Sequence, residues 1–189
     1  LAFLPAPLRA RFGAVYRLDY YDEEALVAIL RRGAELLALD YEEDGIREIA
    51  RRSRGTPRIA LRILRRVRDY AQVKGKGRLT SDIVNNALAM ERIDALGLDD
   101  LDRAFMRALI EVYEGGPAGI EAIAETLGEE RDTLEDVVEP YLLQIGFVRR
   151  TKRGREITQA ACEHLKMNLK PSKKLSAEAS LFEDDAEES

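Results

Sequence analysis

The stretch FVRRTKRGREIT at residues 147–158 decides the fold class. Residues 147–150 favour a strand, 152–154 a turn and 155–158 the returning strand, so the stretch predicts a β-hairpin whose turn carries a cluster of positive charges. Helical periodicity is found at about 101–112, 120–127, 133–145 and 160–165. Three helices followed by a basic hairpin is the order of a winged-helix domain, a relative of the helix-turn-helix.

The first half of the chain predicts a helical bundle. Asp22 suits the N-cap of a first helix, with acidic residues in the first turn behind it. One apolar stripe of this helix is formed by Leu26, Ile29, Leu30, Leu36 and Leu37. Further helices are expected at about 43–52, at 56–73 and after Thr80, and a short strand at 15–20. The predicted fold class is therefore mainly α, a helical bundle followed by a winged-helix domain with a small β-hairpin.

Composition excludes several classes of function. The chain has 189 residues with a single cysteine, Cys162, and a single histidine, His164, so a disulfide scaffold and a cysteine-based zinc site are excluded. No stretch matches Gly-x-x-x-x-Gly-Lys-Ser/Thr, so the chain by itself holds no P-loop. No apolar run approaches the roughly 20 residues of a membrane span, and we expect a soluble, cytoplasmic chain. Because the chain opens at Leu1 in an apolar, proline-punctuated stretch, we also expect it to be part of a longer protein.

Charge is unevenly distributed along the chain. Residues 1–78 hold 17 basic and 11 acidic side chains, whereas residues 79–189 hold 13 and 24, so the net charge of −5 hides a basic first half. Eight arginines and no acid occur between 51 and 68. This run is either a solvated helix face or a surface for phosphate or an acidic partner, since like charges repel unless an anion lies nearby.

Three arginine-bearing motifs are candidates for anion binding. Thr56 and Pro57 suit the start of a helix, which puts Arg58 in the first turn, where unpaired amides already favour anions. Arg11 lies in a loop bounded by Pro and Gly and is either part of a solvated turn or aimed at a neighbouring subunit's phosphates. The hairpin concentrates five positive charges, which suit the DNA backbone, although a solvated surface remains the alternative: Arg149, Arg150, Lys152, Arg153 and Arg155.

Taken together, these motifs resemble the C-terminal part of the RuvB family of AAA+ ATPases. The matching stretches run in order along residues 1–166: PLRARFG at 7–13, RRSRGTPRIA at 51–60, LRRVRDYA at 64–71, GGPAG at 115–119, GEERDTLEDV at 128–137, EPYL at 139–142, GF at 146–147 and RTKRGR at 150–155. Lys152 departs from the family, which often has Pro at this position. As a set, the stretches identify the chain as similar to one family rather than to winged-helix proteins in general.

The resemblance implies a role for each candidate residue. Arg11 matches the arginine finger that reaches the nucleotide of the next subunit, and Arg9 is its less certain neighbour. Arg58 matches the sensor 2 arginine of the lid domain, and Pro57 and Tyr20 accompany it as nucleotide-binding candidates. The wing residues that match DNA contacts are Arg150, Arg153 and Arg155.

The resemblance also implies an architecture and partners. Residues 1–20 would end the AAA+ nucleotide-binding domain, 21–96 would form the lid and 97–166 the winged helix. Residues 167–189 have no place in the family pattern, and their composition predicts a disordered acidic tail. The complete protein would be a homo-hexamer that uses ATP and Mg²⁺ to drive Holliday junction branch migration in the bacterial cytoplasm, with RuvA and RuvC as partners. The P-loop, the Walker B acids and the RuvA-docking hairpin would precede Leu1, so the chain alone is expected neither to bind a cofactor nor to hydrolyse ATP.

Three alternatives to the motor remain open from the sequence. A standalone winged-helix regulator or an initiator-type AAA+ protein would share the hairpin and the bundle, but a regulator leaves Arg11 and Arg58 without a role. The third alternative is a truncated chain that joins working hexamers and interferes with their activity.

Overall fold

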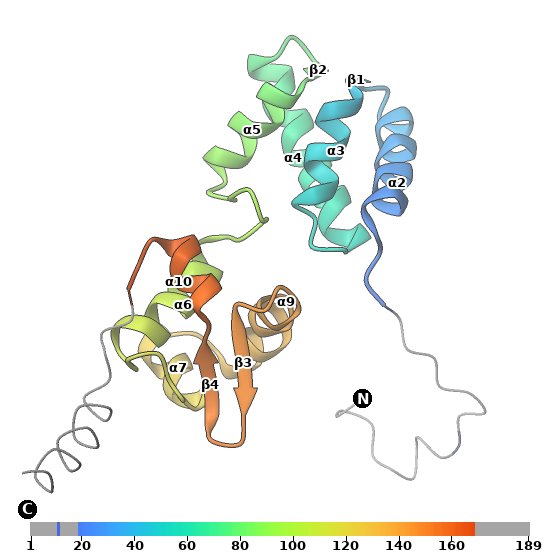
Figure 1. Ribbon diagram of the computed structural model, residues 1–189. Coiled ribbons are helices and arrows are strands. Elements are labelled where there is room, and N and C mark those ends of the chain that lie inside the picture. The colour runs from blue at the N-terminus through green and yellow to red at the C-terminus, as the bar shows by residue number, and fades with distance from the viewer. Residues whose placement is uncertain (1–10, 12–18, 169–189) are drawn as a thin grey trace, which may run out of the picture. The chain divides into compact units, whose positions relative to one another are not determined.

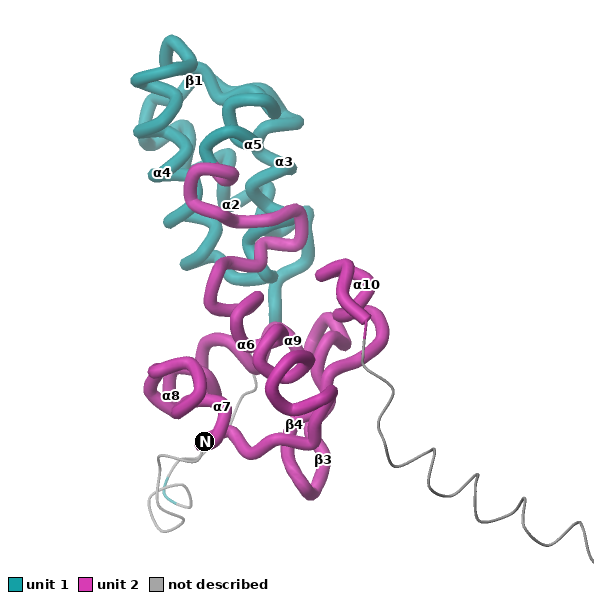
Figure 2. Tube along the Cα trace, turned by 90° about the vertical axis from the view of Figure 1, so that its left-hand side faces the viewer, with its two compact units in different colours: residues 1–87 teal, residues 88–189 magenta. Residues whose placement is uncertain are grey.

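The computed structural model describes Arg11 and residues 19–168. Most of the strand expected at 15–20 therefore lies outside the described residues, and Asp19 and Tyr20 are not in a strand. The acidic tail expected after residue 167 lies almost entirely outside as well. The chain divides into two compact units, Leu1–Ala87 and Leu88–Ser189 (Figure 2), which are described one at a time.

The described residues of unit 1 form four helices and one pair of very short strands. The helices are α2 (Glu23–Leu36), α3 (Glu43–Arg51), α4 (Pro57–Lys74) and α5 (Ser81–Met90), the last of which continues into unit 2 (Figure 1). Asp22 is the N-cap of α2, as predicted, and its carboxylate accepts a hydrogen bond from the amide of Ala25 at 2.7 Å. Leu36 was expected in the apolar stripe but is exposed, because α2 ends there.

The two short strands of unit 1 were not predicted. β1 (Asp40–Tyr41) and β2 (Arg78–Leu79) pair in parallel across the crossover formed by α3 and α4. Strands of two residues carry no alternation of apolar and polar side chains, so the sequence held no periodic signal for them. Gly45 in α3 lies against β2, because a Cβ at this position would be only 2.8 Å from the carbonyl oxygen of Leu79.

Unit 2 has the predicted winged-helix order. Its elements are α6 (Asp100–Glu111), α7 (Ile120–Leu127), α8 (Arg131–Thr133), the π-helical segment η1 (Leu134–Val138), α9 (Glu139–Gln144), β3 (Val148–Thr151), β4 (Gly154–Ile157) and α10 (Gln159–Leu165). β3 and β4 form the antiparallel hairpin. Ala118 pairs with Arg155 as an isolated bridge and adds a third, one-residue strand to the hairpin. The protein is therefore mainly α-helical with a small β-hairpin, as predicted.

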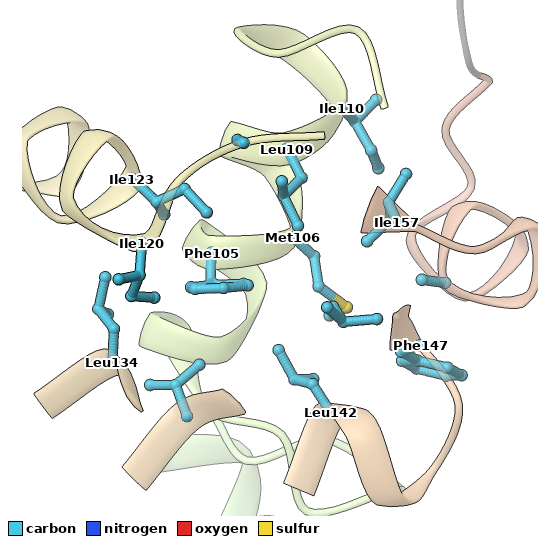
Figure 3. Packing of buried hydrophobic residues seen from close by; sticks show 14 of the residues in the cluster. Phe105, Met106, Leu109, Ile110, Ile120, Ile123, Leu134, Leu142, Phe147 and Ile157 are labelled. Atoms are coloured by element: carbon cyan, nitrogen blue, oxygen red, sulfur yellow. The ribbon is translucent and has the colours of Figure 1, made fainter. Parts of the chain in front are cut away.

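One core holds unit 2 together. Phe105 and Met106 of α6 and Ile123 of α7 are fully buried in this core, with Phe105 on the side of Ile123 and Met106 extending toward Phe147 (Figure 3). Leu142 of α9 and Ile157 of β4 close the same core from the hairpin side. The core therefore fixes the hairpin to the helices that precede it.

The third helix of unit 2 departs from the single helix expected at 133–145. Its middle turn is the π-helical segment η1, which ends directly before Glu139 and Pro140. Proline has no N–H to donate to the residue four positions earlier, and its ring would clash with that residue's carbonyl group. The wider π turn accommodates Pro140, and the position that follows the turn, Glu139, is buried.

The segment between α5 and α6, where the sequence led us to expect a hinge at Gly97, is hydrogen-bonded to the winged-helix unit. Asp94 shares a 2.8 Å hydrogen bond with Nε2 of His164 in α10. The hydroxyl of Tyr141 donates to the carbonyl oxygen of Leu96 at 2.7 Å. These two bonds make the segment part of unit 2.

Candidate nucleotide-sensing and nucleic-acid surfaces

The N-terminus of α4 is open to an anion. Thr56 is the N-cap residue, as predicted, but its hydroxyl donates to the carbonyl oxygen of Arg54 at 3.2 Å and caps no amide of the helix. Pro57 occupies the first helical position. Arg58 is exposed, and within the described residues it forms no ion pair. A guanidinium group in the first turn of such a helix is a favourable place for phosphate.

The structure brings Tyr20 to the same place. The amide of Tyr21 donates to the carbonyl oxygen of Gly55 at 2.9 Å, so the chain that enters unit 1 runs beside the turn before α4. Gly55 has a φ of +66°, and a Cβ there would lie 2.7 Å from the Cβ of Tyr20. Half of Tyr20 is exposed. Tyr20, Pro57 and Arg58, which were predicted together, therefore surround one turn.

The basic run at 51–68 separates into two groups. One group is compensated within the chain, because Arg51 pairs with Glu23, Arg52 with Glu48 and Arg68 with Asp69. The other group is exposed on one face of α4 and, within the described part of the chain, has no acidic partner: Arg58, Arg62, Arg65 and Arg66. The exposure of this second group fits both alternatives, a solvated helix face and a surface for phosphate or an acidic partner.

The wing exposes fewer free charges than the sequence led us to expect. Arg149, Lys152 and Arg153 are exposed, and within the described residues none of them forms an ion pair. Arg150 and Arg155, in contrast, face each other across β3 and β4, and both are paired with Glu139. Arg155 keeps only 12% of its side chain exposed, whereas Arg150 keeps 51%.

Glu139 is the functional-site residue that the sequence analysis missed. Its side chain is fully buried, and burial by itself raises the pKa of its carboxyl group. Hydrogen bonds from Arg150 and Arg155 outweigh this effect, so its pKa is lower than usual. The available signal was a pair of acids, Glu135 and Glu139, one helical turn apart and shortly before a hairpin with five positive charges.

Comparison with known proteins covers both units. Residues 21–94 match the family model described as the RuvB AAA lid domain, and residues 95–166 match that of the RuvB C-terminal winged helix domain. The chain belongs to the RuvB family. The start of α4 with Arg58 lies within the match to the lid model, and the wing and the buried Glu139 lie within the match to the winged-helix model.

Relatives of known name support the same assignment. The Holliday junction branch migration complex subunits RuvB of Dehalococcoides mccartyi and Ligilactobacillus salivarius are 55% and 54% identical over 164 and 162 residues, which is 87% and 86% of this chain. The Thermotoga maritima RuvB Holliday junction branch migration motor superimposes with a TM-score of 0.85 at 46% identity, covering 89% of this chain and 57% of that one. The chain spans about half the length of the curated RuvB relatives, 47% and 48%.

The remaining candidates are distributed as follows. Arg11 is exposed in a turn, and Arg9 lies outside the described residues. His164 is half-buried and bonded to Asp94, and burial raises the pKa of the Cys162 thiol, which agrees with an inert cysteine. In the described part of the chain, no group of three His, Cys, Asp or Glu side chains is placed to hold a metal, and no helix is long and apolar enough to cross a membrane.

Proposed function

We propose that this RuvB-family chain is the lid and DNA-gripping part of an ATP-driven motor that drives Holliday junction branch migration in recombination and repair. One observation carries the proposal: the same chain has an exposed arginine without an acidic partner among the described residues, Arg58, at a helix start that no side chain caps, and a wing with three exposed cations. These cations are Arg149, Lys152 and Arg153. A standalone winged-helix regulator would explain the wing alone, and the match to the lid model over residues 21–94 does not favour it.

The lid side of the motor would sense the nucleotide. Arg58 would act as the sensor 2 arginine, with Tyr20 and Pro57 beside it, and Arg11 would act in trans as the arginine finger of a homo-hexamer. ATP with Mg²⁺ would supply the γ-phosphate whose hydrolysis provides the free energy for the motor. The residues at the start of α4 fit a phosphate group, but the sequence has no P-loop, so we expect the chain alone to be inactive as an ATPase.

The wing would grip the DNA backbone. Arg153, together with its exposed neighbours Arg149 and Lys152, would contact phosphates, and Gly154 follows Arg153 in the chain. Phosphate contacts carry no sequence information, which suits a motor that must move along any sequence. In the complete protein, RuvA would bind through the part that precedes this chain and RuvC would join at the junction, in the bacterial cytoplasm.

The salt dependence of duplex binding tests the DNA side of the proposal. For the chain titrated onto duplex DNA, Arg153→Ala should reduce the slope of log K against log salt by about 0.9, the loss of one phosphate contact. Arg131→Ala is the matched control in the same unit, because Arg131 is an exposed arginine already paired with Glu121 and Glu135. An unchanged slope for Arg153→Ala removes the wing from the DNA interface.

ATP turnover tests the lid side. The chain would be joined to the nucleotide-binding part of a RuvB relative, and Arg58→Ala should lower turnover by at least about tenfold, given what arginines that sense the γ-phosphate contribute. Arg62→Ala is the control, since Arg62 is exposed one turn further along the same helix. Equal turnover in the two variants contradicts a sensor role for Arg58.

A further inference from the structure

Arg150 and Arg155 form a pair of like charges in the wing. They are direct partners across β3 and β4, where like charges normally destabilise a hairpin. Beneath them lies the fully buried carboxylate of Glu139, and Glu135 is 3.7 Å and 3.6 Å from their Nη2 atoms. A buried carboxylate is costly unless hydrogen bonds compensate it, so this arrangement needs all three residues.

Every bond in the cluster uses the same edge of each arginine. Arg150 donates from Nε to Oε1 of Glu139 at 3.0 Å and from Nη2 to Oε2 at 2.6 Å. Arg155 donates from Nε to Oε1 at 2.9 Å and from Nη2 to Oε2 at 3.0 Å. Both carboxylate oxygens therefore accept two bonds, and both guanidinium planes are fixed by a bidentate contact.

The Nη1 atom of each arginine takes no part in this cluster, and the two side chains differ in exposure, 51% for Arg150 and 12% for Arg155. Among the described residues, no partner holds Nη1 of Arg150 or Arg155. Nη1 of Arg155 is not a buried atom without a partner, since the one such atom among the partly or fully buried residues that the structure describes is Nε of Arg52. Nη1 of Arg150 therefore has free N–H donors on an exposed side chain, whereas Nη1 of Arg155 keeps only limited contact with solvent.

We propose that Glu139 is a positioning residue for DNA binding, which fixes Arg150 and Arg155 so that their Nη1 groups meet backbone phosphates. This inference deepens the proposed function of the wing and rests on it. Glu139 touches no DNA itself; it acts by holding two arginines, which would otherwise repel each other, in one geometry before DNA arrives. Preorganised donors bind more tightly because little side-chain entropy is lost on binding.

The substitution Glu139→Gln tests the proposal, because positioning and simple electrostatic attraction predict opposite changes in the affinity for duplex DNA. It changes the formal net charge from −5 to −4 at a site beside the wing, so electrostatic attraction alone predicts tighter binding of duplex DNA. Loss of positioning predicts the opposite, a weakening of about tenfold, the order found when a carboxylate that orients a binding side chain is lost at a metal site. Tighter or unchanged binding by Glu139→Gln overturns the proposal.

Glu156→Gln is the matched control. Glu156 lies on β4 next to Arg155 and opposite Arg149, and within the described residues it forms no ion pair. The substitution Glu156→Gln removes one negative charge from the hairpin without touching the cluster. This variant should bind duplex DNA as tightly as the unsubstituted chain or more tightly. If Glu156→Gln weakens binding as much as Glu139→Gln does, the effect is not one of positioning.

A second pair of variants decides the question if Glu139→Gln does not fold. Arg155→Lys keeps the charge but cannot form the bidentate contact, so it should weaken binding several-fold while the salt slope stays within about 0.3 of the original. Arg153→Lys, which has no such contact to lose, should bind nearly as the unsubstituted chain does. Equal affinities for the two lysine variants overturn the positioning role, whereas failure of the unsubstituted chain to bind duplex DNA overturns the proposed function itself.

Discussion

Gly154 offers a sharp test of how the wing is held against the helices. Its φ is +145°, and a Cβ at this position would lie 2.3 Å from the carbonyl oxygen of Ala118 and 2.6 Å from its carbonyl carbon. Neighbouring Arg155 exchanges two backbone hydrogen bonds with Ala118, of 2.9 Å and 2.8 Å. Gly154→Ala must therefore move the hairpin away from Ala118 or strain the backbone.

The expected cost follows from these contacts. A non-glycine residue in a sparsely populated backbone region costs about 1–3 kcal/mol, and each backbone hydrogen bond lost costs about 1 kcal/mol. The sum is about 3–5 kcal/mol, a large part of the stability of a domain, which is typically about 5–15 kcal/mol. Gly119→Ala is the control, because Gly119 has a φ of −69° and nothing lies within 4 Å of its added Cβ.

Amide hydrogen exchange of α6, measured in the whole chain, reports the free energy of unfolding of unit 2 separately from unit 1. Gly154→Ala should lower this free energy by about 3–5 kcal/mol, and Gly119→Ala should change it by less than about 1 kcal/mol. A loss below about 1 kcal/mol for Gly154→Ala would show that the close approach to Ala118 is not required for the fold of the wing.

Three further predictions follow from burial, charge and capping. Phe105→Ala removes a fully buried ring and should cost unit 2 about 3–5 kcal/mol, measured by the same exchange experiment. The pKa of Glu139 is lowered in the folded state, so its contribution to stability is present above its unfolded pKa of about 4.3 and is lost as the pH falls through its folded pKa. Glu139→Gln should therefore make the free energy of unfolding of unit 2 depend less on pH below about pH 4, as followed by acid titration. Asp22→Ala removes the bond to Ala25 and should destabilise α2 by about 1 kcal/mol, seen as faster amide exchange in its first turn.

Hydrophobic periodicity and the start and stop signals of helices predicted most of the fold, because these signals depend on residues close together in the chain. Residues 43–52 and 120–127 were placed almost as the structure has them, since each carries an apolar stripe between clear stops. The parallel pair of β1 and β2 was missed because two-residue strands have no period. The π turn before Pro140 was missed because the same apolar spacing fits a plain α-helix.

The candidate sites were predicted less completely, for a physical reason. The position of Arg58 in the first turn of α4 was predicted because the helix start is encoded in consecutive residues, whereas its role stays a prediction. The roles of Arg150 and Arg155 depend on a carboxylate 11 and 16 residues earlier in the chain, which only the folded hairpin brings within hydrogen-bond distance. Counting charges predicted five free cations in the wing, whereas two of the five are held by Glu139.

The helix that precedes the wing predicts that the domain binds DNA without sequence preference. Winged-helix relatives of the helix-turn-helix read bases by inserting this helix into the major groove. Here the helix and the turn before it expose several acidic side chains: Glu129, Glu130, Asp132 and Asp136. Carboxylates at these positions would face the phosphates that line the groove, and the resulting repulsion disfavours insertion. Contact through the wing alone leaves only phosphate recognition, so duplexes of equal length and unrelated sequence should bind within about twofold of one another at a fixed salt concentration. A preference above about tenfold, or 1.4 kcal/mol, would mean that base edges are read and that the acidic helix enters the groove in spite of its charge.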